Sequence, residues 1–534
     1  MLKRLLIVIV LACLMMSSLP LSGCATQPVK HGEGVSEVTL DSGTARGTVQ
    51  DGVQVFLGIP YAAPPVGELR WKEPQPVKPW KGVRDCNKFS LACPQPATRL
   101  YDIGQTSEDC LYLNVWSPAR SDDEALPVMV WIHGGGFTTG TASFKMYDGM
   151  NLARQGVIIV TINYRLGPLG FLSHPLLSKE SAHGVSGNYG LLDQIAALKW
   201  VKSNIKAFGG NPDLVTIFGE SAGAGSVIDL MISPLADGLF QRAISESGSF
   251  SDAYPINRDD TVAKAEITGE ALAKKLGADK SPDALTAMRL IPADDVVKAA
   301  FDGYEALGST RYRPVVDGWV IPADPWSMYS AGKQKKVPLL IGTQADEGTI
   351  FILTNLLVQA MTVQDYEGYI TTIYKDNAAE ALSLFPAAAK GDVPGVYAKL
   401  FGIMSFGAGL LHAADSSSAN GSPVYVYRFT HVPDFFLKMF GAFHGLDIFY
   451  VFGNLRADKV SIPDSEVDTA LSQDMMKYWT NFARTGDPNG TGLTQWPAYT
   501  AAGGQYMEFG DQLTVRSGMY KEYRGLMDRV TAGK

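Results

Sequence analysis

The chain of 534 residues is short of charge, and it has no cluster of basic residues after its N-terminus. Asp, Glu, Lys and Arg make up only 19% of it, and the formal net charge is −8, so no nucleic-acid partner is expected. The hydrophobic share is 46%, which excludes a disordered chain and predicts a large folded core.

Cysteine is also scarce, with five residues in all and no C-x-x-C pair, so a zinc or redox site has little support. Cys13 and Cys24 belong to the N-terminal segment. The remaining Cys86, Cys93 and Cys110 are an odd number. One disulfide and one free thiol is the simplest arrangement, and three reduced, buried thiols are the alternative.

The N-terminus lacks an apolar run long enough to span a bilayer, but it has the features of an export signal. Lys3 and Arg4 precede a short apolar stretch, Leu5–Met16. The stretch ends in Leu21-Ser-Gly-Cys24, which resembles the lipobox of bacterial lipoproteins, where cleavage precedes a cysteine whose sulfur is then lipidated. The alternative is an ordinary secretory signal with a chance cysteine.

The lipobox resemblance has consequences for processing and location. It predicts a signal peptide over residues 1–23, a lipidated Cys24 and a flexible tether over 24–36. Ala25, not Asp, follows the cysteine, which by resemblance favours the outer membrane. We therefore expect an exported protein of the cell envelope whose membrane contact is the lipid anchor.

Alternating strands and helices then predict an α/β fold. Residues 127–132 and 157–162 are continuous apolar runs, as in strands buried on both faces, whereas 111–116 alternates like a half-exposed strand. A helix over 191–205 precedes a strand at 215–218, and such alternation indicates a parallel sheet. Further segments are expected as strands at 337–342 and 424–429 and a helix at 472–485.

No repeat or linker divides residues 37–534, so a single catalytic domain is expected. Residues 37–51 predict a small antiparallel start to the sheet. Residues 260–300 and 361–399 are mostly helical in pattern and predict helical excursions from the central, mostly parallel sheet.

Gly219-Glu-Ser221-Ala-Gly223 has the G-x-S-x-G pattern of a nucleophile elbow, between the strand at 215–218 and a helix opening at Ala222. A serine at such a turn is backbone-strained and crowded, which favours glycine two positions to either side. The pattern alone is weak evidence, because a glycine-rich turn without chemistry gives the same letters.

Partners for this serine occur in the required order. His133-Gly-Gly-Gly136 follows a buried strand and matches the H-G-G-G type of loop that supplies oxyanion-hole N–H groups. Asp346 and Glu347 lie just past the carboxyl end of the strand at 337–342, and sites on parallel sheets are built at such strand ends. The sequence alone does not decide which of the two is the acid.

A base must come after the acid, which leaves three of the seven histidines. His431 ends a strand ahead of a proline, and His412 lies in a helical run. His444 lies in a glycine-flanked loop that would present it freely, so His444 is the preferred candidate.

Motifs along almost the whole mature sequence resemble the type-B carboxylesterases, the cholinesterase-like branch of the α/β-hydrolases. They are Gly58–Ala62, Ser107–Asn114, Trp131–Phe137, Asn163–Arg165, Gly187–Gln194, Phe208–Pro212, Phe218–Gly223, Asp346–Gly348, the His444 loop and Thr485–Asn489.

The resemblance implies an α/β-hydrolase fold and a role for each site residue. It implies Ser221 as nucleophile, Glu347 as acid and His444 as base. Its other implications are an oxyanion hole from Gly135, Gly136 and Ala222, supporting roles for Glu220 and Ser247, and a disulfide between Cys93 and Cys110.

The resemblance predicts hydrolysis of carboxylic esters through an acyl-enzyme, with no metal or organic cofactor. A choline ester is disfavoured, because only Tyr101, and no tryptophan, lies between Cys93 and Cys110. Gly308-Ser-Thr310 suggests room for a bulky acyl group. The alternatives are a lipase, an amide or carbamate hydrolase, and a binding protein on an inactive hydrolase scaffold.

Overall fold

Alternate residues of one central strand enter two different hydrophobic cores. In β6 (Leu126–Ile132), Val128 and Val130 lie in one core, whereas Met129 and Trp131 lie in the other. Helices therefore cover both faces of the sheet, as the continuous apolar run predicts. The computed structural model describes residues 34–98, 102–248, 250, 261–302, 312–353, 355–457 and 460–531.

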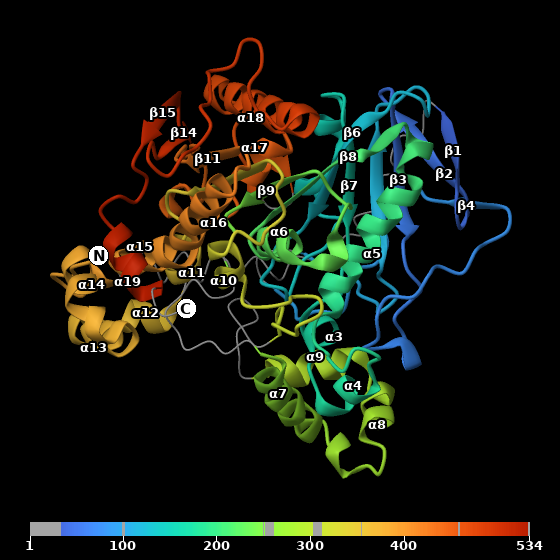
Figure 1. Ribbon diagram of the computed structural model, residues 1–534, viewed down its shortest axis with the longest axis horizontal. Coiled ribbons are helices and arrows are strands. Elements are labelled where there is room, and N and C mark those ends of the chain that lie inside the picture. The colour runs from blue at the N-terminus through green and yellow to red at the C-terminus, as the bar shows by residue number, and fades with distance from the viewer. Residues whose placement is uncertain are drawn as a thin grey trace, which may run out of the picture. The chain divides into compact units, whose positions relative to one another are not determined.

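The sheet is mixed, and its parallel part is central. Its order is β1-β2-β3-β5-β7-β6-β8-β9-β10-β11-β14-β15, with β4 beside β2. The strands from β7 to β14 pair in parallel, and the strands toward the two edges pair antiparallel, except that the short β4 pairs with β2 in parallel (Figure 1). The strands are β1 Val35–Leu40, β2 Gly43–Gln50, β3 Val53–Pro60, β4 Val83–Asp85, β5 Tyr112–Ser117, β6 Leu126–Ile132, β7 Ile158–Ile162, β8 Gly210–Glu220, β9 Arg242–Glu246, β10 Leu339–Gln344, β11 Val424–Phe429, β14 Gln505–Phe509 and β15 Leu513–Ser517, with a separate pair β12 Arg456–Ala457 and β13 Val460–Ser461.

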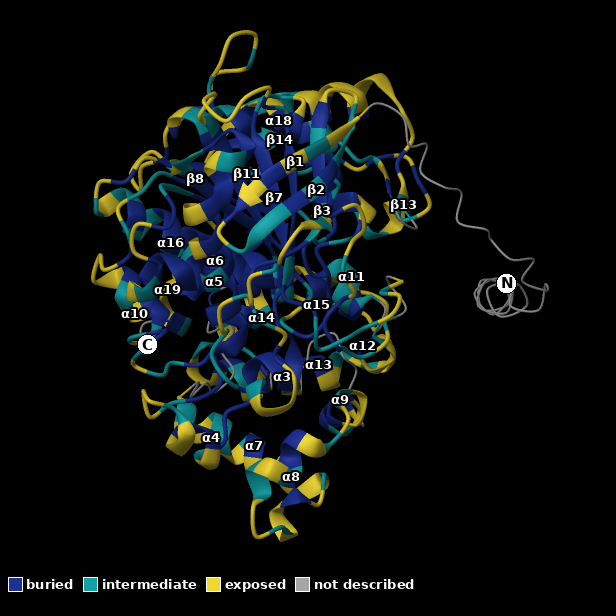
Figure 2. Ribbon diagram, turned by 90° about the vertical axis from the view of Figure 1, so that its right-hand side faces the viewer, coloured by how far each residue is buried: buried dark blue, intermediate teal, exposed yellow. Residues whose placement is uncertain are grey.

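Helices fill the connections between strands. They are α2 Met150–Ala153, α3 Gly167–Phe171, α4 Pro175–Glu180, α5 Tyr189–Asn204, α6 Ala222–Ile232, α7 Val262–Lys275, α8 Ala284–Leu290, α9 Ala293–Phe301, α10 Pro325–Ser330, α11 Thr349–Ile352, α12 Leu356–Ala360, α13 Val363–Tyr374, α14 Ala378–Leu384, α15 Val393–Gly402, α16 Ala408–Ala419, α17 Asp447–Val451, α18 Glu466–Thr485 and α19 Arg524–Thr531. The predicted excursions are α7–α9 and α13–α15. In Figure 2, α6 is dark blue, whereas exposed residues are frequent on α7 and α8.

Two helices, α15 and α16, join through a π-helical turn, Ile403–Gly407, into one long apolar helix. The combined helix, Val393–Ala419, is long and apolar enough to cross a membrane by composition, but 78% of its most apolar window is buried inside the protein. Its residues belong to the same core as α5 and α6, so it is a core helix.

Two expectations differ from the observed fold. β5 is buried along almost its whole length, not half-exposed, because both faces of the sheet are covered there: Leu113 and Val115 lie in one core, and Trp116 lies in the other. β1 begins at Val35, inside the tether expected over 24–36. The predicted signal peptide over 1–23 and Cys24 lie outside the described residues, as do Tyr101 and Gly308–Thr310.

Candidate active site

Ser221 stands at a strained turn between β8 and α6. Its φ of 57° and ψ of −122° lie outside the usual regions for a residue with a side chain. The turn is held from both sides, since Ser221 N donates to Glu246 O at 3.0 Å and Gly225 N donates to Ser221 O at 2.9 Å. The strand–turn–helix context expected for the G-x-S-x-G pattern is therefore present.

The glycines of the pattern allow the turn to pack against the end of β6. A Cβ atom on Gly223 would lie 1.9 Å from the carbonyl oxygen of Ile132, and one on Gly219 would lie 2.6 Å from the same oxygen. Gly134 lies against the other side, where a Cβ would be 3.0 Å from that of Ser221. Any larger residue would push the serine turn away from the glycine loop.

Replacing Gly223 with Ala is expected to lower the free energy of unfolding by about 3 kcal/mol or more, because backbone atoms must move to admit the methyl group. Gly368→Ala is the matched control. Gly368 lies in the exposed middle of α13 with open space at its Cβ position, so this change should stabilise the protein by about 0.5–1 kcal/mol. Urea unfolding of both variants tests this, and equal effects would contradict the packing argument.

Four neighbouring parallel strands bring the predicted residues to one edge of the sheet. In sheet order, Ser221 follows β8, Ser247 follows β9, Glu347 follows β10 and His444 follows β11. The glycine loop follows β6, on the other side of β8. Since parallel strands end at the same edge, residues far apart in the sequence converge there.

The glycine loop turns back on itself after β6. Gly135 has a φ of 105° and Gly136 a φ of 64°, and the Gly135 carbonyl accepts from Thr138 N and Thr139 N. Among the described residues, the Gly135 and Gly136 amides have no hydrogen-bond acceptor. The amide of Ala222 is the first of α6, where helix N–H groups are free.

His133 supports this loop and is not a base. Its ring stacks on Tyr164 with ring centres 4.5 Å apart, and its Nδ1 lies 2.8 Å from Gly134 O. Burial lowers the pKa of His133 to about 4, so the ring is neutral at neutral pH.

Glu347 and His444 form a short, buried hydrogen bond. His444 Nδ1 lies 2.5 Å from Glu347 Oε2, and the other carboxylate oxygen accepts from Thr343 Oγ1 at 2.5 Å and Gln344 N at 2.7 Å. Burial opposes the charge on Glu347, but His444 and these donors hold its pKa below the ordinary value.

The neighbouring Asp346 points to the backbone of the histidine loop. It accepts from Ala442 N at 2.9 Å through its side chain, and its own N–H donates to Ala442 O. The structure thus brings Glu347, not Asp346, to the imidazole.

Ser247 lies at the end of β9, with a φ of 51°, and its N–H donates to Gly342 O at 2.8 Å. The Ser247 hydroxyl is near enough to Glu347 to favour the charged carboxylate, but Ser247 Oγ makes no well-formed hydrogen bond with a described residue.

The second nitrogen of His444 faces Glu220. Nε2 lies 3.1 Å from Glu220 Oε1, but no described residue, Ser221 included, makes a well-formed hydrogen bond with Nε2. The side chain is only 8% exposed, so the loop does not present it freely as expected. The rings of Phe351 and Phe406 cover it, with centres 5.0 and 4.7 Å away.

Buried carboxyl groups surround the imidazole. Burial raises the pKa of Glu220 to about 8 and that of Asp447 to about 6, and it raises the pKa of Glu246 well above its usual value. Trp479 Nε1 donates to Glu246, and Tyr427 Oη donates to Asp447. Of the nearby carboxyl groups, Glu220, Glu347 and Asp447 favour the imidazolium form of His444, while the raised pKa of Glu220 and of Asp447 shows that burial opposes placing several negative charges together there.

The other two candidate histidines have structural contacts elsewhere. His412 stacks on Trp326 with ring centres 3.8 Å apart. His431 Nε2 lies 2.9 Å from Asp468 Oδ1, and its Nδ1 lies 2.6 Å from Asp511 Oδ1. Within the described ranges, no group of three or more His, Cys, Asp or Glu side chains is arranged to hold a metal ion.

A disulfide joins Cys93 to Cys110, as the resemblance implies. Cys86 is a free, fully buried thiol, and burial raises its pKa to about 11.

Sequence reasoning missed several contacts of the site. One is the hydrogen bond from Thr343 to Glu347. The only sequence signal for it was that Thr343 directly follows the apolar run at 337–342. Phe406 is another, because its approach to His444 depends on the π-helical turn that carries it.

This geometry, with a strained serine, a glycine loop and an acid–histidine pair on successive strand ends, defines an α/β-hydrolase. The chain belongs to the carboxylesterase family, whose model matches residues 34–526. It is therefore a carboxylic ester hydrolase, and its substrates are small-molecule esters.

Relatives match almost the whole chain. It is 39% identical to the fumonisin B1 esterase of Sphingopyxis macrogoltabida, over 90% of this chain and 87% of that one. It is 38% identical to the para-nitrobenzyl esterase of Bacillus subtilis (strain 168), over 91% and 97%. The structure of the carboxylesterase EST55 of Geobacillus stearothermophilus superposes with a TM-score of 0.80 at 37% identity, covering 92% of this chain and 99% of that one.

Proposed function

We propose that Ser221 is the nucleophile, His444 the general base and Glu347 the acid of a serine esterase. The observation that carries this proposal is the 2.5 Å hydrogen bond between Glu347 and His444 on the strand ends beside the Ser221 turn. His444 takes the Ser221 proton as Oγ attacks the ester carbonyl, and Glu347 stabilises the imidazolium. The hydrogen bond from Ser221 to Nε2 forms fully once substrate is bound.

The negative charge of the tetrahedral intermediate falls on the carbonyl oxygen of the substrate. The free amides of Gly135, Gly136 and Ala222 are the donors that stabilise it, each contributing on the order of 10²–10³ in rate. His444 then protonates the leaving alcohol, and water releases the acid from Ser221 with the same base. Glu220 and Ser247 support this chemistry through the charges of His444 and Glu347.

The aromatic wall beside His444 supports an apolar group in the substrate. Phe351, Phe401 and Phe406 have ring centres 5.8–6.4 Å apart, and two of these rings contact the imidazole. The relatives named for fumonisin B1 and para-nitrobenzyl esters also point to sizeable organic esters. We propose a carboxylesterase of soluble esters with aryl or alkyl groups.

A chain-length series of aryl and triacyl esters tests this proposal. Activity that saturates below the solubility limit of the substrate is expected. A sharp rise above that limit would identify a lipase instead, and no turnover together with no labelling by an organophosphate would identify a binding protein. Amide and carbamate substrates are measured in the same assay, and a higher kcat/KM for either than for the esters would identify an amide or carbamate hydrolase.

The pH profile depends on Glu220. Burial alone would lower the pKa of His444, but Glu220 and Glu347 outweigh it and raise that pKa to about 9. Removing the charge with Glu220→Gln lowers the pKa of His444. Because the base must be neutral, the acid limb of the kcat/KM profile should move to lower pH by about one unit or more. The exposed carboxylate of Asp213 gives the control Asp213→Asn, and a shift of equal size there would count against the proposal.

We also propose that the protein is exported and anchored to the outer membrane through lipid on Cys24. The support is the sequence Leu21–Cys24 after a short apolar run. Cys24→Ala should abolish incorporation of labelled palmitate and move the enzyme from the membrane fraction to the soluble fraction. Unchanged fractionation would count against the anchor.

A further inference from the structure

A cavity of about 650 Å³ lies beside the loop of Asp346 and Glu347, and none of the residues assigned above to the active site lines it. Its volume is within the roughly 300–1,000 Å³ typical of ligand sites. Ala345, which directly precedes Asp346, forms part of its wall. The rest of the wall comes from α15, the π-helical turn after it, β11, β14 and residues 518–523. We call it the Arg428 cavity, after the β11 residue in its wall.

Arg428 has no carboxylate partner in the part of the chain that the structure describes. Its side chain is half-buried, and it forms no ion pair there. Nε is fully buried without a hydrogen-bond partner, so the two Nη atoms are the nitrogens that can face the cavity. Burial raises the pKa of Asp346, and the Ala442 amide and the charge of Arg428 oppose that rise, but Asp346 does not pair with Arg428. Because buried charges are normally paired, this guanidinium is suited to a counter-ion from outside the chain.

Aromatic rings form much of the remaining surface of the Arg428 cavity. Tyr506, Tyr520 and Tyr523 line it and are only 5–7% exposed. The Cζ atom of Arg428 lies 5.3 Å from the ring centre of Tyr520, which is a cation–π contact. Lys399 Nζ lies at the same distance from the ring of Tyr523. A ligand here would therefore meet both cationic groups and the faces or edges of aromatic rings.

The charge balance of the Arg428 cavity is positive. Lys399 and Lys521 are exposed residues of its wall and add two ammonium groups to the guanidinium. Neither lysine forms an ion pair with a described residue. Glu522, also exposed, is the one acidic residue among the described residues of the wall. Three cations against one carboxylate favour an anionic ligand.

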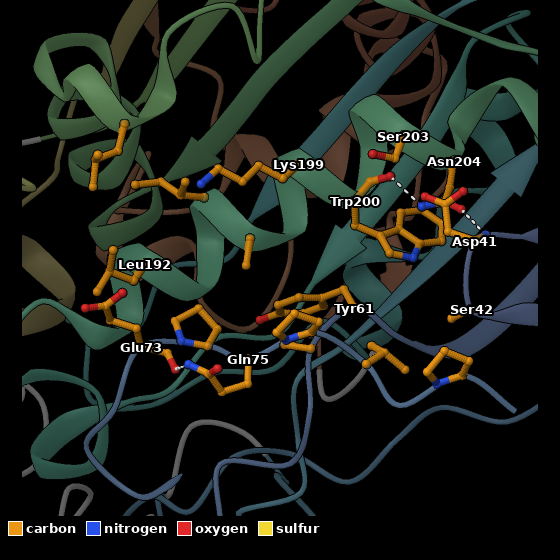
Figure 3. A pocket seen from close by; sticks show the side chains of 18 of the residues that line it. Asp41, Ser42, Tyr61, Glu73, Gln75, Leu192, Lys199, Trp200, Ser203 and Asn204 are labelled. Carbon is orange, nitrogen blue, oxygen red and sulfur yellow. Dashed lines mark hydrogen bonds between the residues drawn. The ribbon is translucent and has the colours of Figure 1, made fainter.

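A cavity between α5 and the proline-rich segment from Glu73 to Pro79 has the opposite charge balance (Figure 3). Its wall contains the carboxylates of Asp41 and Glu73 and a single cation, Lys199. The chain as a whole has a formal net charge of −8. The positive charge is therefore a local property of the Arg428 cavity.

We propose that the Arg428 cavity binds an organic monocarboxylate with an aromatic or alicyclic body. The carboxylate accepts two parallel hydrogen bonds from the Nη atoms of Arg428, because the planar guanidinium matches the geometry of a carboxylate. The body lies against the tyrosine rings. This binding site is separate from Ser221 and requires no turnover.

Calorimetric titration with 2-naphthoate tests the proposal, because this probe is an aromatic carboxylate without an ester. The probe 2-naphthamide has nearly the same shape and no charge. Wild-type protein is compared with Arg428→Gln, which removes the guanidinium, and with Lys399→Glu, which reverses an exposed charge of the wall. Lys333→Glu is the matched control, since Lys333 is exposed and does not line the cavity. Circular dichroism of each variant reports that it is folded.

Saturable binding of 2-naphthoate to wild type is expected, with affinity about 10- to 100-fold lower in Arg428→Gln. Lys399→Glu should lower the affinity about 2- to 5-fold, and Lys333→Glu should leave it unchanged. The amide should bind at least about 10-fold more weakly than the carboxylate.

Undiminished affinity of Arg428→Gln would place the carboxylate at another site and overturn the proposal. Equal affinities of 2-naphthoate and 2-naphthamide would overturn it too, as would equal losses in Lys399→Glu and Lys333→Glu. If Arg428→Gln does not fold, the two lysine variants and the amide decide the question. Wild-type protein that binds no 2-naphthoate would also contradict the proposal, whatever its esterase activity.

Discussion

Replacement of Ser221 with Ala is expected to reduce kcat for an aryl ester by on the order of 10⁵-fold or more, with no burst of released phenol. Without Oγ no acyl-enzyme forms, and only the oxyanion donors and substrate binding remain. The strained backbone at φ 57° is held by Glu246 O and Gly225 N, neither of which contacts the lost oxygen, so the variant should stay folded.

Pre-steady-state release of phenol checks this result. Ser121→Ala, at an exposed serine, is the matched control and should keep the full burst. A burst of wild-type amplitude from Ser221→Ala would remove Ser221 as the nucleophile, and a variant that unfolds at lower urea concentration would need the comparison repeated at matched folded fraction.

Replacement of Glu347 with Gln is expected to lower kcat/KM by about 10⁴-fold. Glutamine is similar in shape but uncharged, and its NH2 group can donate to His444 Nδ1. The ring proton would then lie on Nε2, which is the wrong tautomer for a base. The imidazolium would also lose the charge that lies 2.5 Å away. Steady-state kinetics on a soluble aryl ester measures the effect, and a normal circular dichroism spectrum shows that the loss is chemical.

Asp346→Asn separates the two adjacent acids. Asp346 holds the Ala442 amide and does not reach the imidazole, so this variant should lose stability and keep most of its activity. The reverse result, with Asp346→Asn inactive and Glu347→Gln active, would transfer the acid role to Asp346.

Most central strands were predictable because they are continuous apolar runs. The run at 424–429 matches β11 residue for residue. β9 was missed because only three residues separate Arg242 from Glu246, too short a run to be recognised. Its burial comes from the two cores on the faces of the sheet, since Ala243 lies in one and Ile244 in the other. The start of α18 was placed at 472, six residues late. The Ser465 cap that accepts from Asp468 N was the overlooked signal.

The site was predictable in its order but not in its contacts. Spacing gave the serine, the glycine loop and the histidine, because each must follow a strand. It could not separate Asp346 from Glu347, since adjacent side chains in a loop point in different directions. Nor could it give the approach of Phe406 to His444 or of Glu220 Oε1 to Nε2, because both depend on packing between segments far apart in the chain.

The odd thiol, Cys86, has a consequence for oxidative folding. Beyond the N-terminal segment the chain has three cysteines, Cys86, Cys93 and Cys110, which allow three pairings, and the described residues contain the Cys93–Cys110 pair. In the folded protein Cys86 is inaccessible, and a thiol with a pKa of about 11 provides almost no thiolate at neutral pH to attack that bond. Scrambling is therefore confined to the time before the core closes over Cys86. An enzyme folded in an oxidising medium would need a disulfide isomerase only during that interval, and Cys86→Ser would remove the need.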